Sequence, residues 1–349
     1  MTIRRTTSAA LAVGALAAAV LLTGCVAGEG AATAGAAAAT PGATATEGGT
    51  LNIDYATYNP LSLVIKEKGW LEAALAPQGI TVNWVKSAGS NKANEALKAG
   101  AIDVGSTAGA AALLAKSNGS EIQTIDIFSQ PEWAAIVVPA NSPITSVKDL
   151  AGKQVAATTG TDPYFFLQQA LEQAGIDPST VTIQNLQHAD GLAALQNGSV
   201  DAWAGLDPIM AKAEAGGAKL LYRNVDFNSY GFLNATTKFI TERPDVAQTV
   251  VNAYEHARAW ALANQAETAQ ILSTEAAIDL AVATKVITER TNLGVSNIPG
   301  DAQVKILTKI GPSLVATGAV KSQDLIDAAI KNLLNDTFAV KADPTVIGK

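Results

Sequence analysis

The sequence predicts an α/β protein of two lobes, each a mostly parallel sheet flanked by helices, followed by a helical C-terminal region. Three observations predict this architecture. Short runs rich in β-branched residues alternate with helical patterns from Thr50 to Tyr222, an order typical of βαβ units. One helix-to-strand junction occurs twice, and after about Asn234 the pattern becomes almost entirely helical.

The first 24 residues have the pattern of a secretory signal peptide. Arg4 and Arg5 precede an uncharged apolar stretch, residues 9–22, which is too short to span a membrane comfortably. The residues just before Cys25 are Leu-Thr-Gly, and together with that cysteine they resemble the bacterial lipobox. We therefore expect residues 1–24 to be removed and Cys25 to carry a lipid that anchors the exported protein at the outer face of the cell membrane.

Residues 25–49 are expected to form a flexible tether. They are mostly Ala, Gly and Thr with almost no large apolar side chain, so they cannot bury enough surface to offset the entropy lost on ordering. Cys25 is the only cysteine of the 349 residues, which excludes an internal disulfide and a metal site built on cysteine.

Nine strands are expected, and each is a short β-branched or apolar run. They lie at 50–55, 81–85, 104–106, 123–128, 134–138, 154–157, 180–185, 202–206 and 219–222. Helices between them are expected to begin near Leu61, Lys92, Ala108, Pro163, Asp190 and Pro208, with a further helix from Arg243 to Asn264. The helix at Pro163 is the clearest, because proline suits the first helical position and Gly175 ends the pattern.

An internal echo supports two similar lobes. Residues 96–104 read ALKAGAIDV, and residues 194–202 read ALQNGSVDA. Each copy is a helix end that passes through glycine into a strand, and each follows an earlier strand-helix unit. Because the two copies occupy the same place in two matching units, we interpret them as equivalent parts of two lobes.

Charge and motif content exclude several functions. A net charge of −7 without basic clusters argues against nucleic-acid binding. His188 and His256 are the only histidines, and the motifs of serine hydrolases, P-loops and zinc proteases are missing from the sequence. We therefore expect no enzyme, no cofactor and no metal; the alternative is an acid-base pair of His188 and Asp190.

The chain resembles the periplasmic-binding-protein fold (type II), specifically the sulfonate, nitrate and taurine type of substrate-binding protein. The resemblance extends over 49–349 and is strongest up to Glu214. Five segments carry it: KEKGW from Lys66, GAIDVGSTAGAAA from Gly100, SQPEWAAIVVP from Ser129, SVKDLAGKQVAATTGTDPYFFL from Ser146 and GSVDAWAGLDPIMAKAE from Gly198.

The resemblance implies how the chain is divided. Residues 50–137 and 230–349 would form one lobe, and residues 138–229 the other, with hinge connections near 136–141 and 226–232. The ligand would lie between the lobes, at the carboxyl ends of the strands, where open α/β sheets generally bind ligands.

Two strand-to-helix turns are candidate anion sites. One consists of Ser106, Thr107 and Ala108, and the other of Thr159, Gly160 and Thr161. Free backbone N–H groups and the helix dipole allow such turns to bind an anion without a basic side chain. The alternative is that both turns are ordinary helix caps.

Further residues are placed near the cleft by their position after strands. Their aromatic and amide groups could hold an organic tail, although core packing is the alternative for each aromatic. They are Tyr58, Asn59, Gln130, Trp133, Tyr164, Phe165 and Trp203.

Four carboxylates also fall on loops near the expected cleft. Asp162 and Asp207 are interpreted as helix N-caps. Glu132 and Asp190 have no such explanation, and a buried carboxylate would repel an anion. We therefore expect these two to face an amine on the ligand.

Together these features predict a monomeric extracytoplasmic receptor of an ABC importer. It would bind a small organic sulfonate or a taurine-like amino-sulfonate, close around it, and deliver it to a membrane permease with its ATPase subunits. The alternatives are a receptor for nitrate or another oxyanion, a receptor for a pyrimidine like a thiamin precursor, and a sensory lipoprotein without transport.

Overall fold

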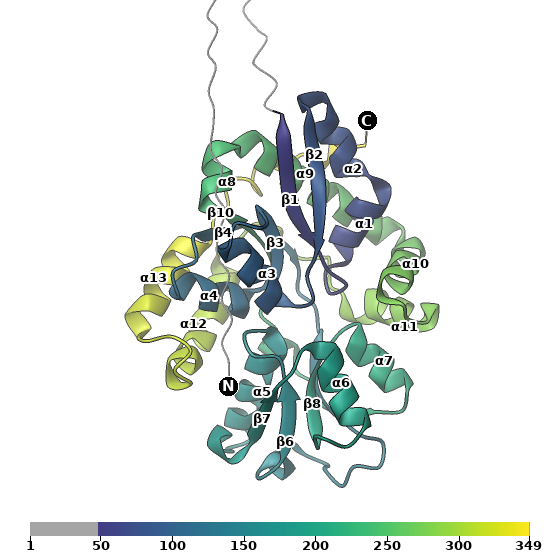
Figure 1. The fold of residues 1–349 in the computed structure, drawn as a ribbon, viewed down its shortest axis with the longest axis vertical. Coiled ribbons are helices and arrows are strands. Elements are labelled where there is room, and N and C mark those ends of the chain that lie inside the picture. The colour runs from purple at the N-terminus through teal and green to yellow at the C-terminus, as the bar shows by residue number, and fades with distance from the viewer. Residues whose placement is uncertain (1–47, 349) are drawn as a thin grey trace, which may run out of the picture. The chain divides into compact units, whose positions relative to one another are not determined.

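The computed structural model describes residues 48–348, which form two lobes, each built around a five-stranded sheet (Figure 1). The predicted signal peptide, Cys25 and nearly all of the predicted tether lie outside the described residues. The first sheet consists of β1 (Gly49–Tyr55), β2 (Ile80–Lys86), β3 (Val104–Ala108), β4 (Ile122–Ser129) and β10 (Gly231–Thr236). The second consists of β5 (Ala134–Val138), β6 (Gln154–Ala157), β7 (Thr182–Asn185), β8 (Ala202–Leu206) and β9 (Lys219–Tyr222).

The two sheets share one topology. Their strand orders are β2-β1-β3-β10-β4 and β7-β6-β8-β5-β9. In the first sheet β1 runs parallel to β2 and β3, and β10 is antiparallel to β3 and β4. In the second, β6 runs parallel to β7 and β8, and β5 is antiparallel to β8 and β9. The α/β class and the doubled architecture predicted from the internal echo are confirmed.

Two predictions about the strands need correction. β10 was not predicted, because its run contains Asn234 and looks like the beginning of the helical region. Asn234 is fully buried, and its amide bonds Thr107 and Thr124 on the two neighbouring strands. β5 pairs with β8 and β9, so the lobe boundary and first hinge lie at 130–133 instead of 137 or 136–141.

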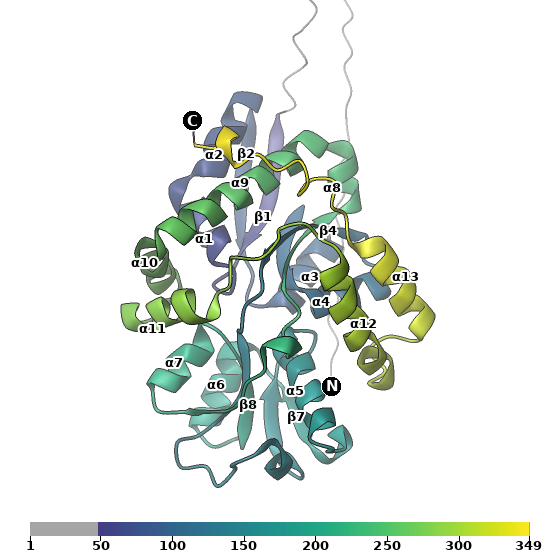
Figure 2. The ribbon, with the colours of Figure 1, turned by 180° about the vertical axis from the view of Figure 1, so that it is seen from behind.

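Helices cover both sheets. Those of the first lobe are α1 (Pro60–Lys68), α2 (Trp70–Leu75), α3 (Ser90–Lys98) and α4 (Gly109–Ser117), and those of the second are α5 (Asp162–Gln173), α6 (His188–Gln196) and α7 (Ile209–Ala215). The C-terminal region adds α8 (Thr237–Glu242), α9 (Pro244–Ala263), α10 (Gln265–Ala276), α11 (Leu280–Lys285), a π-helix (Val286–Arg290), α12 (Asp301–Ala316) and α13 (Gln323–Leu333). α9 runs along the back of the first sheet (Figure 2).

Strand residues of the second sheet alternate between two cores. Ala135, Val137 and Trp203 lie in one buried cluster with α6 and α7. Ile136 and Ala204 lie in another, which includes apolar residues of α5. This alternation follows from the two-residue period of a strand. Both faces of the sheet are therefore covered, and the carboxyl ends of β6, β7 and β8 form the edge that meets the first lobe.

Two crossings connect the lobes, at residues 130–133 and 223–230. A C-terminal segment lies beside the first crossing, because the N–H of Gln130 donates to the carbonyl of Asn292 and that of Glu132 to the carbonyl of Arg290. Among the described residues, no helix is long and apolar enough to cross a membrane.

Candidate ligand site between the lobes

Asp162, at the first position of α5, links the second lobe to both crossings. Its carboxylate accepts hydrogen bonds from the indole N–H of Trp133 and the backbone N–H of Ser229, each at 2.9 Å, and from the Ser229 hydroxyl. The predicted N-cap role is wrong, because Thr161 occupies the cap position. Burial raises the pKa of Asp162 to about 6, although these hydrogen bonds lower it.

The first predicted anion turn, at the N-terminus of α4, is filled by the second crossing. The N–H of Gly109 donates to the carbonyl of Tyr230, and the N–H of Ala110 donates to the Ser229 hydroxyl. A Cβ at Gly109 would lie 2.3 Å from the Ser229 carbonyl oxygen, so only glycine permits this approach. The two N–H groups are therefore occupied within the protein.

The polar residues of that turn are also bonded internally. The N–H and hydroxyl of Ser106 donate to Asp54, and the Thr107 hydroxyl donates to the Ala108 carbonyl. The N–H of Ala108 donates to the Ser90 hydroxyl at 3.0 Å. Ser106, Thr107 and Ala108 thus hold the first lobe together beneath the cleft.

The second predicted turn, at the N-terminus of α5, retains free donors. The N–H of Thr159 bonds the Asn185 side chain, and the Thr161 hydroxyl donates to the Thr158 carbonyl. The N–H groups of Gly160 and Thr161 make no hydrogen bond within the described part of the chain, although both residues are buried. Buried, unbonded N–H groups at a helix start are suited to an anion.

The first lobe approaches this turn with the N-terminus of α3. A Cβ at Gly160 would lie 3.8 Å from the Cβ of Asn91 and 3.7 Å from a methyl group of Leu114. The side-chain oxygen of Asn91 is buried and has no hydrogen-bond partner among the described residues. Two helix N-termini, from α3 and α5, therefore meet across the boundary between the lobes.

His188, the first residue of α6, lies beside the start of α3. The Thr158 hydroxyl donates to the Leu186 carbonyl at 2.7 Å, so at 3.2 Å the Nδ1 of His188 is the donor to that hydroxyl oxygen. Its Nε2 is buried without a partner in the described structure and would lie 3.0 Å from a Cβ at Gly89. Burial lowers the pKa of His188 to about 4, so the ring is neutral near pH 7.

We call the set of Gly89, Asn91, Gly160, Thr161 and His188 the junction. Gly89, Asn91 and His188 were not predicted as ligand contacts, although the sequence carries a signal for them. Gly89 and Ser90 are small residues at a strand-to-helix turn, as in the turns that were predicted. The echo also makes the start of α6, at His188, the counterpart of the start of α3.

Several predicted contacts pack or bond inside the protein. The Tyr58 hydroxyl donates to the Ser106 carbonyl, and its ring meets that of Trp133 edge-on at 6.0 Å. Asn59 caps α1 and donates to the Tyr254 hydroxyl. Gln130 is half-buried in the first crossing. These residues form the floor of the boundary between the lobes.

Aromatic residues of the second lobe divide into two groups. Tyr164 is half-buried beside Phe165, and Phe165 lies in an apolar cluster otherwise made of residues from the first lobe and C-terminal helices. Trp203 has no exposed surface and packs against Gly191 of α6. It is the second residue of β8, away from the carboxyl edge, so its prediction as a ligand contact is corrected to a core role.

The carboxylates have partners or are exposed. Glu132 pairs with Arg223 at 2.6 Å, and Asp190 is exposed in the first turn of α6. Asp207 accepts from the N–H of Ala211, as a cap would, and pairs with Arg290. Glu132 thus already has a cationic partner, and the expectation that Glu132 and Asp190 face an amine on the ligand stays a prediction that these contacts do not support. Burial raises the pKa of Asp207 to about 6, and Arg290 opposes that rise.

A pocket of about 490 Å³ opens between the lobes next to His188. We call it the inter-lobe pocket. Thr57, Ser87 and Ile278 line it from the side of the first lobe, and Leu192 and Ile209 from the second. More of its lining is apolar than polar, as in pockets that bind small organic molecules.

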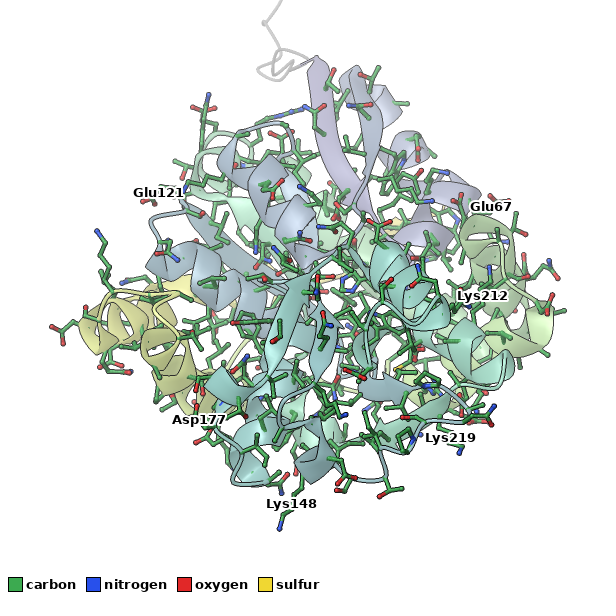
Figure 3. The ribbon with its side chains drawn as sticks, turned by 60° about the horizontal axis from the view of Figure 1, so that its bottom comes forward. Glu67, Glu121, Lys148, Asp177, Lys212 and Lys219 are labelled. Atoms are coloured by element: carbon green, nitrogen blue, oxygen red, sulfur yellow. The ribbon has the colours of Figure 1, made fainter. Side chains whose placement is uncertain are left out.

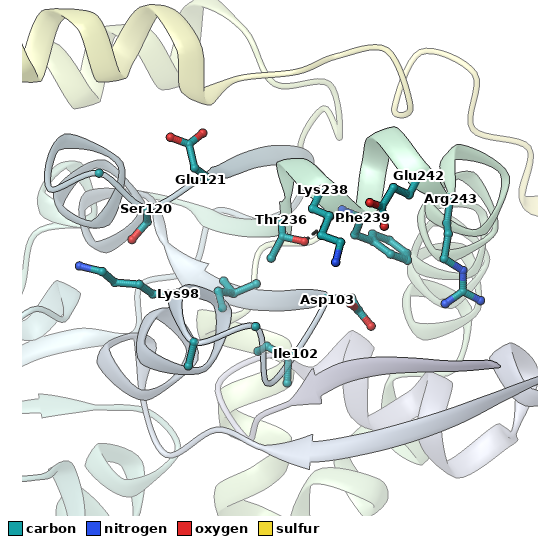
Figure 4. Close-up of a pocket in the computed structure, with 14 residues that line it drawn as sticks. Lys98, Ile102, Asp103, Ser120, Glu121, Thr236, Lys238, Phe239, Glu242 and Arg243 are labelled. Carbon is teal, nitrogen blue, oxygen red and sulfur yellow. Dashed lines mark hydrogen bonds between the residues drawn. The ribbon is translucent and has the colours of Figure 1, made fainter.

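A larger cavity, of about 660 Å³, lies within the first lobe away from the cleft (Figure 4). Three acidic and three basic side chains line it, namely Asp103, Glu121, Glu242, Lys98, Lys238 and Arg243. Their charges cancel, and no residue of the second lobe reaches it. We therefore favour the junction as the ligand site. The described residues contain no cluster of His, Cys, Asp or Glu that could hold a metal ion.

Known proteins resemble this chain over most of its length. Residues 61–268 match the family described as NMT1/THI5 like. A protein of Bacillus subtilis (strain 168) that carries the name aliphatic sulfonates-binding protein is 32% identical over 284 residues, which are 80% of this chain and 84% of that protein.

Solved structures share the fold. The alkanesulfonate-binding protein SsuA from Xanthomonas axonopodis pv. citri, bound to MOPS, aligns with a TM-score of 0.72 and 23% identity over 80% of this chain and 97% of that one. The periplasmic aliphatic sulphonate binding protein SsuA from Escherichia coli gives 0.69 and 25% over 82% and 92%. A desulfurization enzyme, DSZB, has the same fold at 15% identity, with a TM-score of 0.62 over 84% and 98%.

Proposed function

Because this chain belongs to the NMT1/THI5-like family and to its sulfonate-binding group with the periplasmic-binding-protein fold, we propose that it is the solute receptor of an ABC importer and binds an organic sulfonate at the junction. The single observation on which this site assignment rests is the pair of buried, unbonded N–H groups at Gly160 and Thr161. They belong to the second lobe and lie opposite the N-terminus of α3 in the first.

A sulfonate suits these groups chemically. Its oxygens accept hydrogen bonds, and its negative charge is favoured at the positive ends of two helix dipoles. Neither helix start requires an Arg or Lys, which agrees with the scarcity of arginine between Arg5 and Arg223. The unbonded Asn91 oxygen and His188 Nε2 are hydrogen-bond acceptors, so they could contact a donor group of the ligand rather than its sulfonate oxygens.

Ligand contacts from both lobes would stabilise the closed arrangement, because a ligand favours the state in which it makes more contacts. Closure then creates the surface that a membrane permease recognises. We further propose export, lipid anchoring at Cys25 and a monomeric receptor, on the pattern of residues 1–49.

The relatives of this chain that bind solutes support a receptor rather than an enzyme. The fold also occurs in a desulfurization enzyme, so an enzyme needs a separate argument. His188 lies beside the proposed sulfonate position but has no carboxylate partner among the described residues. That arrangement supports binding and does not support acid-base catalysis.

The test is a calorimetric titration with propane-1-sulfonate of the parent chain, Gly89→Ala and the matched control Gly294→Ala. A Cβ at Gly89 would lie 2.9 Å from the Asn91 oxygen and 3.0 Å from the His188 Nε2, whereas a Cβ at Gly294 meets nothing closer than 3.5 Å. The backbone at Gly89 is extended, so alanine causes no backbone strain there. We expect at least a tenfold loss of affinity for Gly89→Ala only.

Equal affinity in all three proteins would place the site elsewhere. Absence of saturable binding to the parent chain, or turnover of the sulfonate, would overturn the receptor function itself.

A further inference from the structure

The inter-lobe pocket contains two lysines that come from opposite lobes. Lys86 ends β2 in the first lobe, and Lys212, which is labelled in Figure 3, lies on α7 in the second. Both side chains are exposed, and neither forms an ion pair within residues 48–348. Unpaired charges of one sign that converge on one pocket repel each other when the lobes close.

The one carboxylate of this pocket does not neutralise the lysines. Glu275 lines the pocket, but its oxygen bonds the ammonium group of Lys66 at 3.0 Å. The local charge at the rim is therefore positive. The rest of the lining is largely uncharged and includes Ala88, Leu192 and Ile209.

His188 lines the inter-lobe pocket and also belongs to the junction, so the two adjoin at this residue. A ligand whose head group lies at the junction would therefore extend its other end past His188 toward the lysines. An apolar spacer suits the Ala and Leu side chains that line the pocket, and a negatively charged end would accept hydrogen bonds from both ammonium groups.

We infer that the ligand is a sulfonate with a second anionic group, such as a carboxylate, at its distal end, and that Lys86 and Lys212 select it. This inference rests on the proposed function. Because the two lysines belong to different lobes, a distal carboxylate removes their repulsion only when the lobes are closed. Lys86 and Lys212 therefore couple ligand choice to closure.

Three ligands with the same two-carbon spacer test the inference. Propane-1-sulfonate ends in a methyl group, 3-sulfopropanoate in a carboxylate, and taurine in an ammonium group. In calorimetric titrations of the mature chain at low salt, we expect 3-sulfopropanoate to bind at least tenfold more tightly than propane-1-sulfonate, and taurine to bind more weakly than both. The preference should shrink as salt is added, because exposed charges are screened.

Variants identify the residues responsible. In Lys86→Met/Lys212→Met, the ratio of the affinities for 3-sulfopropanoate and propane-1-sulfonate should fall to within about twofold. Lys148→Met makes the same charge change on an exposed lysine that does not line the pocket and should keep the ratio.

Each other outcome overturns the inference. The inferred distal anion would be refuted by equal binding of the three ligands, by tightest binding of taurine, or by an unchanged affinity ratio in the double variant. None of these results would contradict the proposed sulfonate receptor. Absence of saturable binding to all three would overturn the proposed function and this inference with it.

Discussion

The indole N–H of Trp133 donates to the carboxylate of Asp162 across 2.9 Å, so the first crossing between the lobes is bonded to the first residue of α5. The same carboxylate holds Ser229 of the second crossing. Both connections between the lobes therefore meet at one buried carboxylate, next to the turn that presents Gly160 and Thr161.

Replacing Asp162 by Ala is expected to destabilise the protein. The substitution leaves the Trp133 and Ser229 donors buried without an acceptor, and each unsatisfied donor costs about 1–3 kcal/mol. We expect the free energy of unfolding, measured by urea denaturation, to fall by about 2–4 kcal/mol. Asp190→Ala, at an exposed position of α6, should change it by less than about 0.5 kcal/mol. Similar values for both variants would contradict a structural role for Asp162.

Asp54 should make the stability depend on pH. It is fully buried in β1, and burial raises its pKa to about 7, compared with about 3.9 in an unfolded chain. The folded state therefore binds more protons between these values. The stabilising contribution is complete below about pH 4 and is lost as the pH rises through 7. Asp162 and Asp207, with pKa values of about 6, act in the same direction.

The variant Asp54→Asn isolates this contribution. Between pH 5 and pH 8 the stability of the variant should rise relative to that of the parent by about 2–3 kcal/mol, since a pKa difference of one between the folded and unfolded states corresponds to about 1.4 kcal/mol. Urea denaturation at both pH values measures the difference, with Asp190→Asn as the exposed control. A parallel pH dependence for parent and variant would show that Asp54 does not titrate in this range.

A disulfide across the junction should trap the closed arrangement. A Cβ at residue 160 would lie 3.8 Å from that of Asn91, which is the usual separation in a disulfide. We expect Asn91→Cys/Gly160→Cys, made together with Cys25→Ser, to oxidise faster when propane-1-sulfonate is present and then to release it slowly. Gel mobility and ligand exchange before and after reduction measure both effects.

Gly160 has a positive φ of 79°, so cysteine there costs about 1–2 kcal/mol. The single variant Gly160→Cys controls for this cost and should exchange ligand normally under oxidising conditions. If the double variant stays reduced with ligand bound, the two lobes do not meet at these residues in the bound state.

Local sequence patterns predicted strands and helices, and these predictions failed where contacts between residues distant in the sequence determine the structure. β5, β6, β8 and β9 have the predicted bounds, because short apolar runs between turn residues specify strands directly. β10 was missed because Asn234 looks unsuitable for a central strand. Its buried amide is acceptable only since Thr107 and Thr124 provide partners, and neither is near it in sequence.

The candidate site likewise contains features that local sequence patterns predict and features that depend on long-range contacts. The turn at Thr159–Thr161 could be identified from its residue types, as small polar residues before a helix. The pairing of Glu132 with Arg223, 91 residues away, could not, and without it Glu132 looked like an unpaired charge. The approach of Gly89 to His188 likewise depends on how the two lobes meet, which no local pattern records.

The position of β10 determines the order in which the lobes can be completed during synthesis. β4 has β10 as its only neighbour in the first sheet, and β10 follows the whole second lobe in sequence. All five strands of the second sheet come from the uninterrupted segment 134–222. The second lobe can therefore fold while β3 and β4 still present open edges, which are prone to pair with other chains. β10, the last strand to be made, closes the facing edges of β3 and β4, and the outer edge of β4 is covered later still, where Ile127 and Thr124 bond Asn297 and Asn335.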